Sequence, residues 1–178
     1  MNSVANGKIY GNTPFEKIYI QSAAGDAGGA IGAAYSVWHK LGGKRDFVMD
    51  HAFWGPHFDN SHFQVLLDSH EEVLRKQHCE ISWLENDNVL CEHTVSAIAK
   101  GKVVGWFQGR MEFGPRALGG RSILGDPRSE QMQKTLNLKV KYRESFRPFA
   151  PSILIEDLSQ WFEFDHDSPY MLFVGKVK

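Results

Sequence analysis

Residues 105–122 read GWFQGRMEFGPRALGGRS, and this stretch carries the strongest structural signal in the sequence. It overlaps the β-rich run Lys102–Phe107, which predicts a short strand that ends in a loop. Guanidinium groups beside closely approachable backbone N–H groups suit a polyphosphate. A solvated basic loop in which Glu112 pairs with an arginine explains the same composition. The loop residues behind both interpretations are Arg110, Arg116, Arg121, Gly109, Gly114, Gly119 and Gly120.

A second basic stretch, LKVKYRESFR at residues 138–147, precedes Pro148. If this segment is extended, Lys141 and Arg143 lie on the same face and would point into one anion site. A basic helix end that interacts with its own dipole is the alternative. Residues 100–147 contain eleven Lys and Arg against four Asp and Glu, although the whole chain has a net charge of only −1. We therefore expect an anionic partner near this region.

The flanking sequence predicts alternating strands and helices, which indicates the α/β class. Strands are expected at 17–21, 102–107 and 170–174. A glycine-rich turn at 22–30 leads into a helix that continues through Trp38, and residues 46–60 are typical of a connector. Further helices are expected at 63–77, 92–100 and 158–162, and from Asp126, as N-cap before Pro127, to about Lys139.

Composition excludes several classes of protein. With 42% hydrophobic and 23% charged residues in 178, the chain is typical of a globular protein with one domain, or one domain and part of another. No apolar run approaches the ~20 residues needed to span a bilayer, and the start lacks signal-peptide features, so a cytoplasmic location is expected. The spacing of Cys79 and Cys91 predicts free thiols, and the histidines form no metal-binding pair.

Residues 105–151 closely resemble the C-terminal region of the carbamoyltransferases that modify nodulation factors, cephalosporins and aminoglycosides. The resemblance is carried by GWFQGRMEFGPRALGGRSILGDPR and MQKTLNLKVKYRESFRPFAPS, and it extends to VANGKI, GDAGGAIGAA and SPYML. It therefore covers nearly the whole chain.

The resemblance implies two domains, of which this chain would hold only parts. Residues 1–58 would be the tail of an actin-like ATPase-fold transferase domain with a linker. Residues 59–178 would be an incomplete α+β YrdC-like domain that forms carbamoyl-adenylate. The family uses ATP to activate carbamoyl phosphate and then transfers the carbamoyl group to a hydroxyl of a small molecule. On this reading the isolated chain is inactive and its main partner is the missing N-terminal domain.

The resemblance also implies roles for individual residues. Lys141, Arg147 and Arg116 match catalytic positions, and together with Arg110 and Arg143 they would bind nucleotide and carbamoyl phosphate. Asp26 matches an acid that completes a metal site, for iron or a similar ion, with ligands from the N-terminal half, while Mg²⁺ would accompany ATP. Without the resemblance, an ordinary helix N-cap is the better interpretation of Asp26.

Three other functions fit parts of the sequence. A YrdC-like threonylcarbamoyl-adenylate synthase or hydrogenase-maturation protein shares the adenylate chemistry. A nucleic-acid-binding module would use the basic stretch and its interleaved aromatic residues, but the sequence pI of about 6.7 argues against it. A non-catalytic fragment that only mediates assembly is the third.

Overall fold

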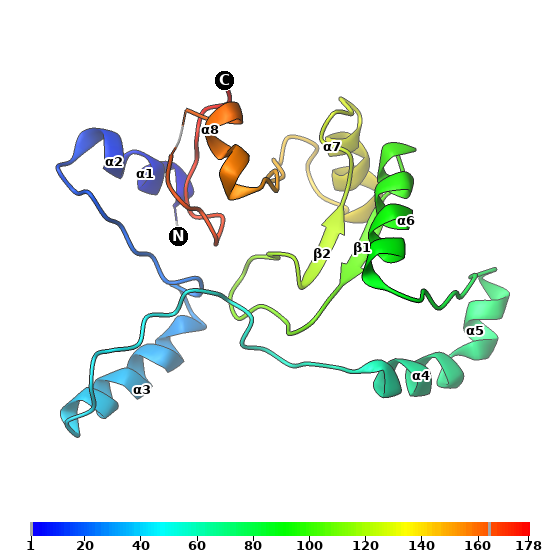
Figure 1. The fold of residues 1–178 in the computed structure, drawn as a ribbon, viewed down its shortest axis with the longest axis horizontal. Helices are drawn as coiled ribbons and strands as arrows, with labels where there is room; N and C mark the ends of the chain where they lie inside the picture. Colours follow the sequence, from blue (N-terminus) through cyan, green and yellow to red (C-terminus); the bar gives the residue numbers. More distant parts are fainter. Residues whose placement is uncertain (1, 164) are drawn as a thin grey trace. The chain divides into compact units, whose positions relative to one another are not determined.

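The computed structural model describes residues 2–163 and 165–178 as an α/β protein (Figure 1). Its contacts divide the chain into two compact units. Unit 1 comprises residues 1–55, 111–121 and 150–178, and unit 2 comprises residues 56–110 and 122–149. Each unit is therefore built from separate stretches of the chain. The assignment of residues 1–58 to an actin-like domain and of residues 59–178 to a YrdC-like domain stays a prediction.

The two-stranded sheet of the described chain is formed by β1 (Val104–Phe107) and β2 (Arg121–Leu124), and all of its residues except Arg121 belong to unit 2. Helix α6 (Asp87–Ala99) runs alongside β1, as Figure 1 shows. It is preceded by α4 (Asn60–Ser69) and α5 (Glu71–Lys76). After β2, helix α7 (Met132–Thr135) continues directly into a π-helical turn, η1 (Leu136–Val140).

Unit 1 contains several helices and a small core formed by residues outside them. The helices are α1 (Ser3–Gly7), α2 (Ile9–Asn12), α3 (Gly28–Lys40), the 3₁₀ turn η2 (Ile155–Asp157) and α8 (Leu158–Trp161). The core is formed by Ala52, Tyr170 and Leu172, against which Ile20 and Leu118 pack. The buried Tyr170 hydroxyl donates a hydrogen bond to the Met49 carbonyl at 3.0 Å.

The strands expected at 17–21 and 170–174 are not formed. Both apolar runs supply side chains to the core, but their backbone groups do not pair as strands. Instead, the Asn6 amide donates to the Leu172 carbonyl at 3.0 Å, and the Ser3 hydroxyl donates to the Met171 carbonyl at 3.2 Å. Met171 itself has a φ of 55°, which interrupts an extended conformation. Side-chain burial thus produced the strand-like pattern without a ladder.

Two expected helices have different bounds. The helix predicted at 63–77 is two helices, because α4 ends at Ser69 and α5 begins at Glu71. The helix predicted at 92–100 begins earlier, at Asp87, where the Asn86 side chain accepts a hydrogen bond from the Val89 N–H at 3.1 Å. The predicted stop at Gly101 is confirmed, with a φ of 75°.

Asp126 is not the N-cap of a helix. Its carboxylate binds Arg128 instead, with Nη2 to Oδ2 at 2.8 Å and the Arg128 backbone N–H to Oδ1 at 2.9 Å. These bonds close a turn, and the helix begins only at Met132. The segment 121–124, assigned to the glycine-arginine loop from the sequence, is the strand β2. The predicted strand at 102–107 and the helix near 158 are confirmed as β1 and α8.

The surface features agree with two simpler expectations. Cys79 and Cys91 are exposed free thiols. Within the described residues, no helix combines the length and the apolar character that crossing a membrane requires.

Candidate functional site

The predicted site residues divide between the two units. Unit 1 contains Asp26 and Arg116, and unit 2 contains the four remaining cations, Arg110, Lys141, Arg143 and Arg147.

A buried carboxylate shapes the loop that carries Arg116. The Oε1 atom of Glu112 accepts hydrogen bonds from the backbone N–H groups of Leu118 at 2.6 Å, Gly120 at 2.7 Å and Arg121 at 3.3 Å. Glu112 is only 7% exposed. The sequence suggested that N–H groups of this loop face a phosphate, but these three already bind Glu112. These three N–H groups are therefore occupied by Glu112 and do not face a phosphate.

Glu112 is ionised at neutral pH despite its burial. Burial raises the pKa of this carboxyl, but the hydrogen bonds from backbone N–H groups outweigh it and bring the pKa below its ordinary value of 4.5. Several N–H donors around one carboxylate strongly favour the charged form. Glu112 therefore acts as a fixed negative centre around which residues 112–121 fold.

Two glycines allow the loop to turn on either side of Arg116. Gly114 and Gly119 have φ values of 138° and 109°, which side chains with a Cβ rarely adopt. A Cβ at Gly114 would also lie 3.0 Å from the Ser22 carbonyl oxygen. The loop is further fixed by the Ser22 hydroxyl, which donates to the Phe113 carbonyl at 3.2 Å. Arg116 is exposed at the surface of this constrained loop.

In unit 2, a buried asparagine organises the basic segment 141–147. Asn137 lies in η1 and is completely buried. Its amide nitrogen donates to the carbonyls of Ser145 at 3.1 Å and Arg147 at 2.8 Å. Its amide oxygen accepts from Arg143 Nε at 2.7 Å. One side chain thus fixes both the path of the segment and one of its cations.

Arg143 has a second constraint on its orientation. Its guanidinium carbon lies 4.9 Å from the centroid of the Phe149 ring, a cation–π contact. Its backbone N–H donates to the Asn137 carbonyl at 2.9 Å. Arg143 is half-buried, so these contacts are partly shielded from water.

The other cations of unit 2 are more exposed. Arg147 forms an ion pair with Glu144, with Nε to Oε2 at 3.3 Å. The pKa of Glu144 is lowered by a hydrogen bond from its own backbone N–H and then by the charge of Arg147. Lys141 caps the end of η1 and is exposed, and Arg110 is exposed in the loop after β1. Lys141, Arg143 and Arg147 thus lie on one short segment, and Arg110 lies on another. Because Lys141 has a helical conformation and Tyr142 a φ of 50°, this segment is not extended, and the alternating same-face arrangement expected for Lys141 and Arg143 is not formed.

Asp26 lies in the turn that precedes α3. It is exposed, and the residue at the N-cap position is Ala27, which makes no side-chain capping bond. The ordinary capping role is therefore wrong for Asp26. Across residues 2–163 and 165–178, no group of three or more His, Cys, Asp or Glu side chains is placed to hold a metal ion. The metal-ligand role stays a prediction that needs ligands from elsewhere.

Sequence reasoning missed the amides that support the basic segment. Asn137 stood out only as a polar residue between Leu136 and Leu138 in an otherwise apolar part of the predicted helix. Gln133, one turn earlier, donates to the Arg147 carbonyl at 3.1 Å. A polar residue on the buried face of a helix is the signal that would have identified Asn137.

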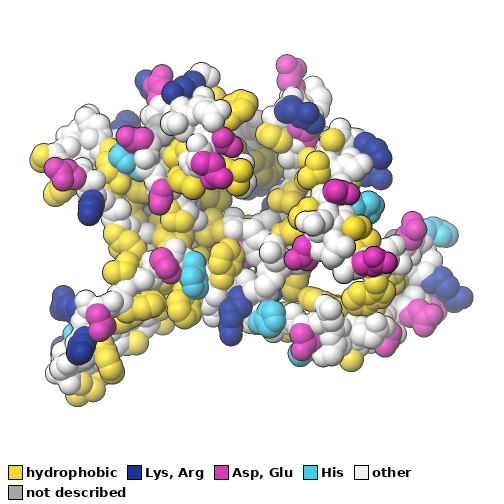
Figure 2. Space-filling view, viewed as in Figure 1, with side chains coloured by type: hydrophobic (Ala, Val, Ile, Leu, Met, Phe, Trp, Pro, Cys, Tyr) yellow, Lys and Arg dark blue, Asp and Glu magenta, His cyan; other side chains and the backbone are white. Residues whose placement is uncertain are grey.

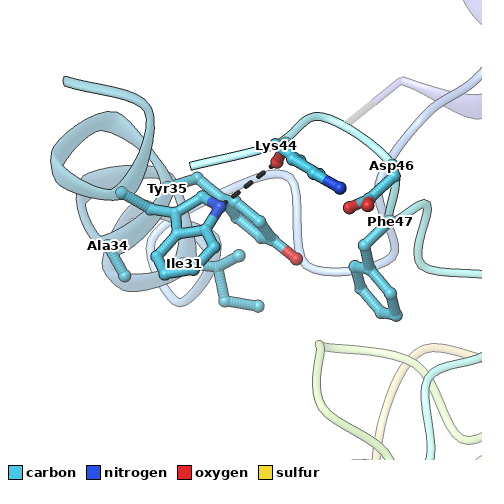
Figure 3. A pocket seen from close by; sticks show the side chains of 7 residues that line it. Ile31, Ala34, Tyr35, Lys44, Asp46 and Phe47 are labelled. Carbon is cyan, nitrogen blue, oxygen red and sulfur yellow. Dashed lines mark hydrogen bonds between the residues drawn. The ribbon is translucent and has the colours of Figure 1, made fainter. Parts of the chain in front are cut away.

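An open pocket of unit 1 lies elsewhere. It has a volume of about 480 Å³ and is open and mostly apolar. The Trp38 Nε1 donates to the Lys44 carbonyl at 3.2 Å. Figure 3 shows Ile31 and Tyr35 of α3 on one side of the pocket and Asp46 and Phe47 on the other. None of the predicted site residues is in its lining, which consists of Ile31, Ala34, Tyr35, Trp38, Lys44, Asp46 and Phe47.

Two family models match the chain. The model described as carbamoyltransferase C-terminus matches residues 95–178, and the model described as carbamoyltransferase N-terminus matches residues 1–35. The first covers β1, β2 and every cation proposed for unit 2. The second covers Asp26 and the beginning of α3.

Curated relatives match over almost the whole chain. An uncharacterized protein of Synechocystis sp. is 50% identical over 100% of this chain and 29% of its own length. The nodulation protein NolO of Bradyrhizobium diazoefficiens is 41% identical over 99% of this chain and 32% of its own. The 3'-hydroxymethylcephem-O-carbamoyltransferase of Streptomyces clavuligerus is 33% identical over 92% of this chain and 28% of its own length. The chain thus spans less than a third of the length of these relatives.

Proposed function

The chain belongs to the carbamoyltransferase family, a family of transferase enzymes, and from this premise we propose that it is part of an ATP-dependent O-carbamoyltransferase. The intact protein activates carbamoyl phosphate with ATP and, with the uptake of water, forms carbamoyl-adenylate, phosphate and pyrophosphate. A hydroxyl oxygen of a small-molecule acceptor then bonds to the carbamoyl carbon, and AMP leaves.

The observation that carries this proposal is the basic segment held by Asn137. Carbamoyl phosphate and ATP are both highly anionic, so bringing them together requires cations that offset their repulsion. Lys141, Arg143 and Arg147 lie within seven residues on a segment whose path is fixed by buried hydrogen bonds. Preorganised cations stabilise developing charge without having to reorganise during the reaction. We assign these three residues to the phosphates.

Arg116 and Arg110 are assigned supporting roles in the same binding step. Both are exposed, and Arg116 stands on the loop that Glu112 and the two left-handed glycines constrain. A guanidinium in a fixed loop loses little conformational entropy when it binds a phosphate. No step in this scheme requires a covalent nucleophile from the chain, because positioning and charge stabilisation supply the acceleration.

The described residues do not complete a metal site. Asp26 would supply one oxygen ligand in the intact protein, and the remaining ligands would come from outside this chain. Hard divalent cations and iron both accept carboxylate ligands. Mg²⁺ bound to ATP is a separate part of the proposal, and so are the cytoplasmic location and the identity of the acceptor as a small hydroxyl compound.

The proposal is tested by ligand binding to the intact protein. Calorimetry with ATP and with carbamoyl phosphate should show that Arg143→Ala and Arg147→Ala weaken binding by one to two orders of magnitude. This expectation follows from ~1.5–3 kcal/mol for each hydrogen bond to a charged group. Pyrophosphate release that depends on carbamoyl phosphate should fall in the same variants.

Lys139→Ala is the matched control, since it removes an exposed cation of η1 that has no assigned role. Its affinity should stay close to that of the wild type. Unchanged affinity in both arginine variants would contradict the assignment of the segment to phosphates. Absence of pyrophosphate release from the wild-type protein with ATP and carbamoyl phosphate would contradict adenylate formation.

A further inference from the structure

We infer that Asn137 is a positioning residue that orients Arg143 for the phosphates of its substrates. This inference rests on the proposed function, because it concerns the same basic segment. It adds a residue that does not itself contact substrate but acts through a neighbouring cation.

The Asn137 side chain is held by hydrogen bonds at both its amide nitrogen and its amide oxygen. Its amide is fully buried, and both ends are bonded: the nitrogen to two carbonyls, and the oxygen to Arg143 Nε. A buried amide that lost these partners would be destabilising, so the arrangement is strongly determined. Asn137 therefore fixes Arg143 rather than following it.

The contacts of Arg143 also determine which part of its guanidinium can reach a phosphate. Its Nε donates to Asn137 Oδ1 at 2.7 Å, and its central carbon lies 4.9 Å from the centroid of the Phe149 ring. The two terminal nitrogens are the parts of Arg143 that these contacts do not use. Two adjacent N–H donors match two oxygens of a phosphate group, which is how arginine recognises phosphate in two-point contacts. The contacts with Asn137 and Phe149 thus leave the two terminal nitrogens of Arg143, which suit a phosphate, as the groups that can bind it.

The backbone next to Arg143 is also constrained. Between η1 and Arg143, Tyr142 has a φ of 50°, which is unfavourable for a residue with a Cβ. The Arg143 N–H to Asn137 carbonyl bond, at 2.9 Å, closes the chain around this residue. Backbone strain of this kind persists only where surrounding contacts enforce it. The π-helical geometry of η1 is itself frequent at functional sites.

Gln133 provides a matched control within the same helix. It lies one turn before Asn137, and its amide donates to the carbonyls of Ser145 at 3.5 Å, Phe146 at 3.4 Å and Arg147 at 3.1 Å. It supports the same segment, but these hydrogen bonds go to backbone carbonyls and not to the Arg143 side chain. If Asn137 acted only by holding the loop, removing either amide would have a similar effect.

A double-mutant cycle in the intact protein tests the inference, with ATP and inorganic pyrophosphate as probes in calorimetry. Asn137→Ala and Arg143→Lys should each weaken binding by about tenfold, since each removes the bond between the amide and Nε. The double variant should bind about as weakly as Arg143→Lys alone, because the two changes remove one shared interaction. Gln133→Ala should stay within about threefold of the wild type.

A measurement without ligand keeps the test valid if Asn137→Ala folds poorly. In protein labelled with ¹⁵N-arginine, the Nε–H signal of Arg143, assigned by its loss in Arg143→Lys, should exchange slowly with water. Rapid exchange in the wild type would overturn the inference, and so would wild-type affinity in Arg143→Lys or additive effects in the cycle. Failure of the wild type to bind either probe would instead overturn the proposed function itself.

Discussion

At the residue scale, Glu112 and Asn137 have the same physical effect in different units. Each is a buried polar side chain that satisfies several backbone groups of a loop and thereby fixes it. Glu112 accepts from N–H groups, whereas Asn137 mainly donates to carbonyls. Buried polar groups with all partners present make a local conformation unique, because any alternative would leave them without hydrogen bonds. In this chain both loops carry candidate phosphate-binding arginines.

Replacement of Glu112 by Gln tests its role in the loop 112–121. The neutral amide oxygen still accepts hydrogen bonds, but each is weaker than a bond to a carboxylate. We expect the backbone N–H groups of Leu118 and Gly120 to exchange with solvent about 5–30-fold faster, corresponding to ~1–2 kcal/mol of local stability. Hydrogen exchange followed by mass spectrometry or NMR gives the measurement. Exchange as slow as in the wild type would mean that other contacts hold the loop.

The same carboxyl predicts a pH dependence. Because the pKa of Glu112 is lower in the folded state than its ordinary value of 4.5, its contribution to stability is fully present above that value. The contribution is lost as the pH falls through the lower, folded-state pKa. Loop protection in the wild type should therefore decline below about pH 4.5. Protection in the Glu112→Gln variant should lack this component, and a parallel decline in both proteins would contradict the assignment.

At the scale of elements, side-chain caps decide where α4 and α6 begin. The apolar pattern predicted α6 from residue 92, but the helix begins at Asp87 because the Asn86 side chain binds the Val89 N–H. Asp59 likewise starts α4 by accepting from the N–H groups of Ser61 and His62. A helix that packs few side chains depends strongly on such local bonds, since its first N–H groups have no partners within the helix.

Asn86→Ala should therefore destabilise the first turn of α6 by ~1 kcal/mol, whereas Asn86→Asp should be nearly neutral because both residues cap well. Amide exchange at Val89 reports the change directly. A comparable loss in both variants would indicate that burial or packing at position 86, and not the capping bond, matters. Unchanged exchange in Asn86→Ala would show that the cap is dispensable.

At the scale of the whole molecule, large apolar side chains remain exposed in both units. In unit 1 they include Val37 and Trp38 of α3, at 57% and 55% exposure, and Leu41 at its C-cap, at 81%. Figure 2 shows hydrophobic side chains on the surface of this helix at the lower left. In unit 2 they include Val65 and Leu66 of α4, at 69% and 57%. Contiguous exposed apolar surface is uncommon in proteins that act alone.

The chain purified by itself should therefore bind a hydrophobic dye such as ANS and unfold with weak cooperativity. If the chain is part of a longer protein, as proposed, that protein should bind less dye per chain and show a sharper calorimetric transition, because burial of apolar surface is the main source of cooperative stability. A sharp two-state transition without dye binding by the isolated chain would contradict this expectation.

The sequence by itself determined the local features of this protein. Short-range patterns predicted β1, the helix at α8, the end of α6 at Gly101 and the concentration of cations between residues 100 and 147. These features depend on residues that are adjacent in the sequence, so their conformational preferences and charges can be read from it directly. The resemblance of residues 105–151 also led to the family, which the two family models confirm.

Only the tertiary structure decided which polar groups meet. The extended runs 17–21 and 170–174 resemble strands in sequence, but whether they form a ladder depends on a partner at hydrogen-bonding distance. Glu112 reaches N–H groups six to nine residues away, and Asn137 reaches Arg143, Ser145 and Arg147 across a turn with a left-handed residue. Such contacts arise where the chain reverses and side chains become buried, and no local sequence pattern specifies them. They determine the positions of arginines that the sequence identified only by residue type.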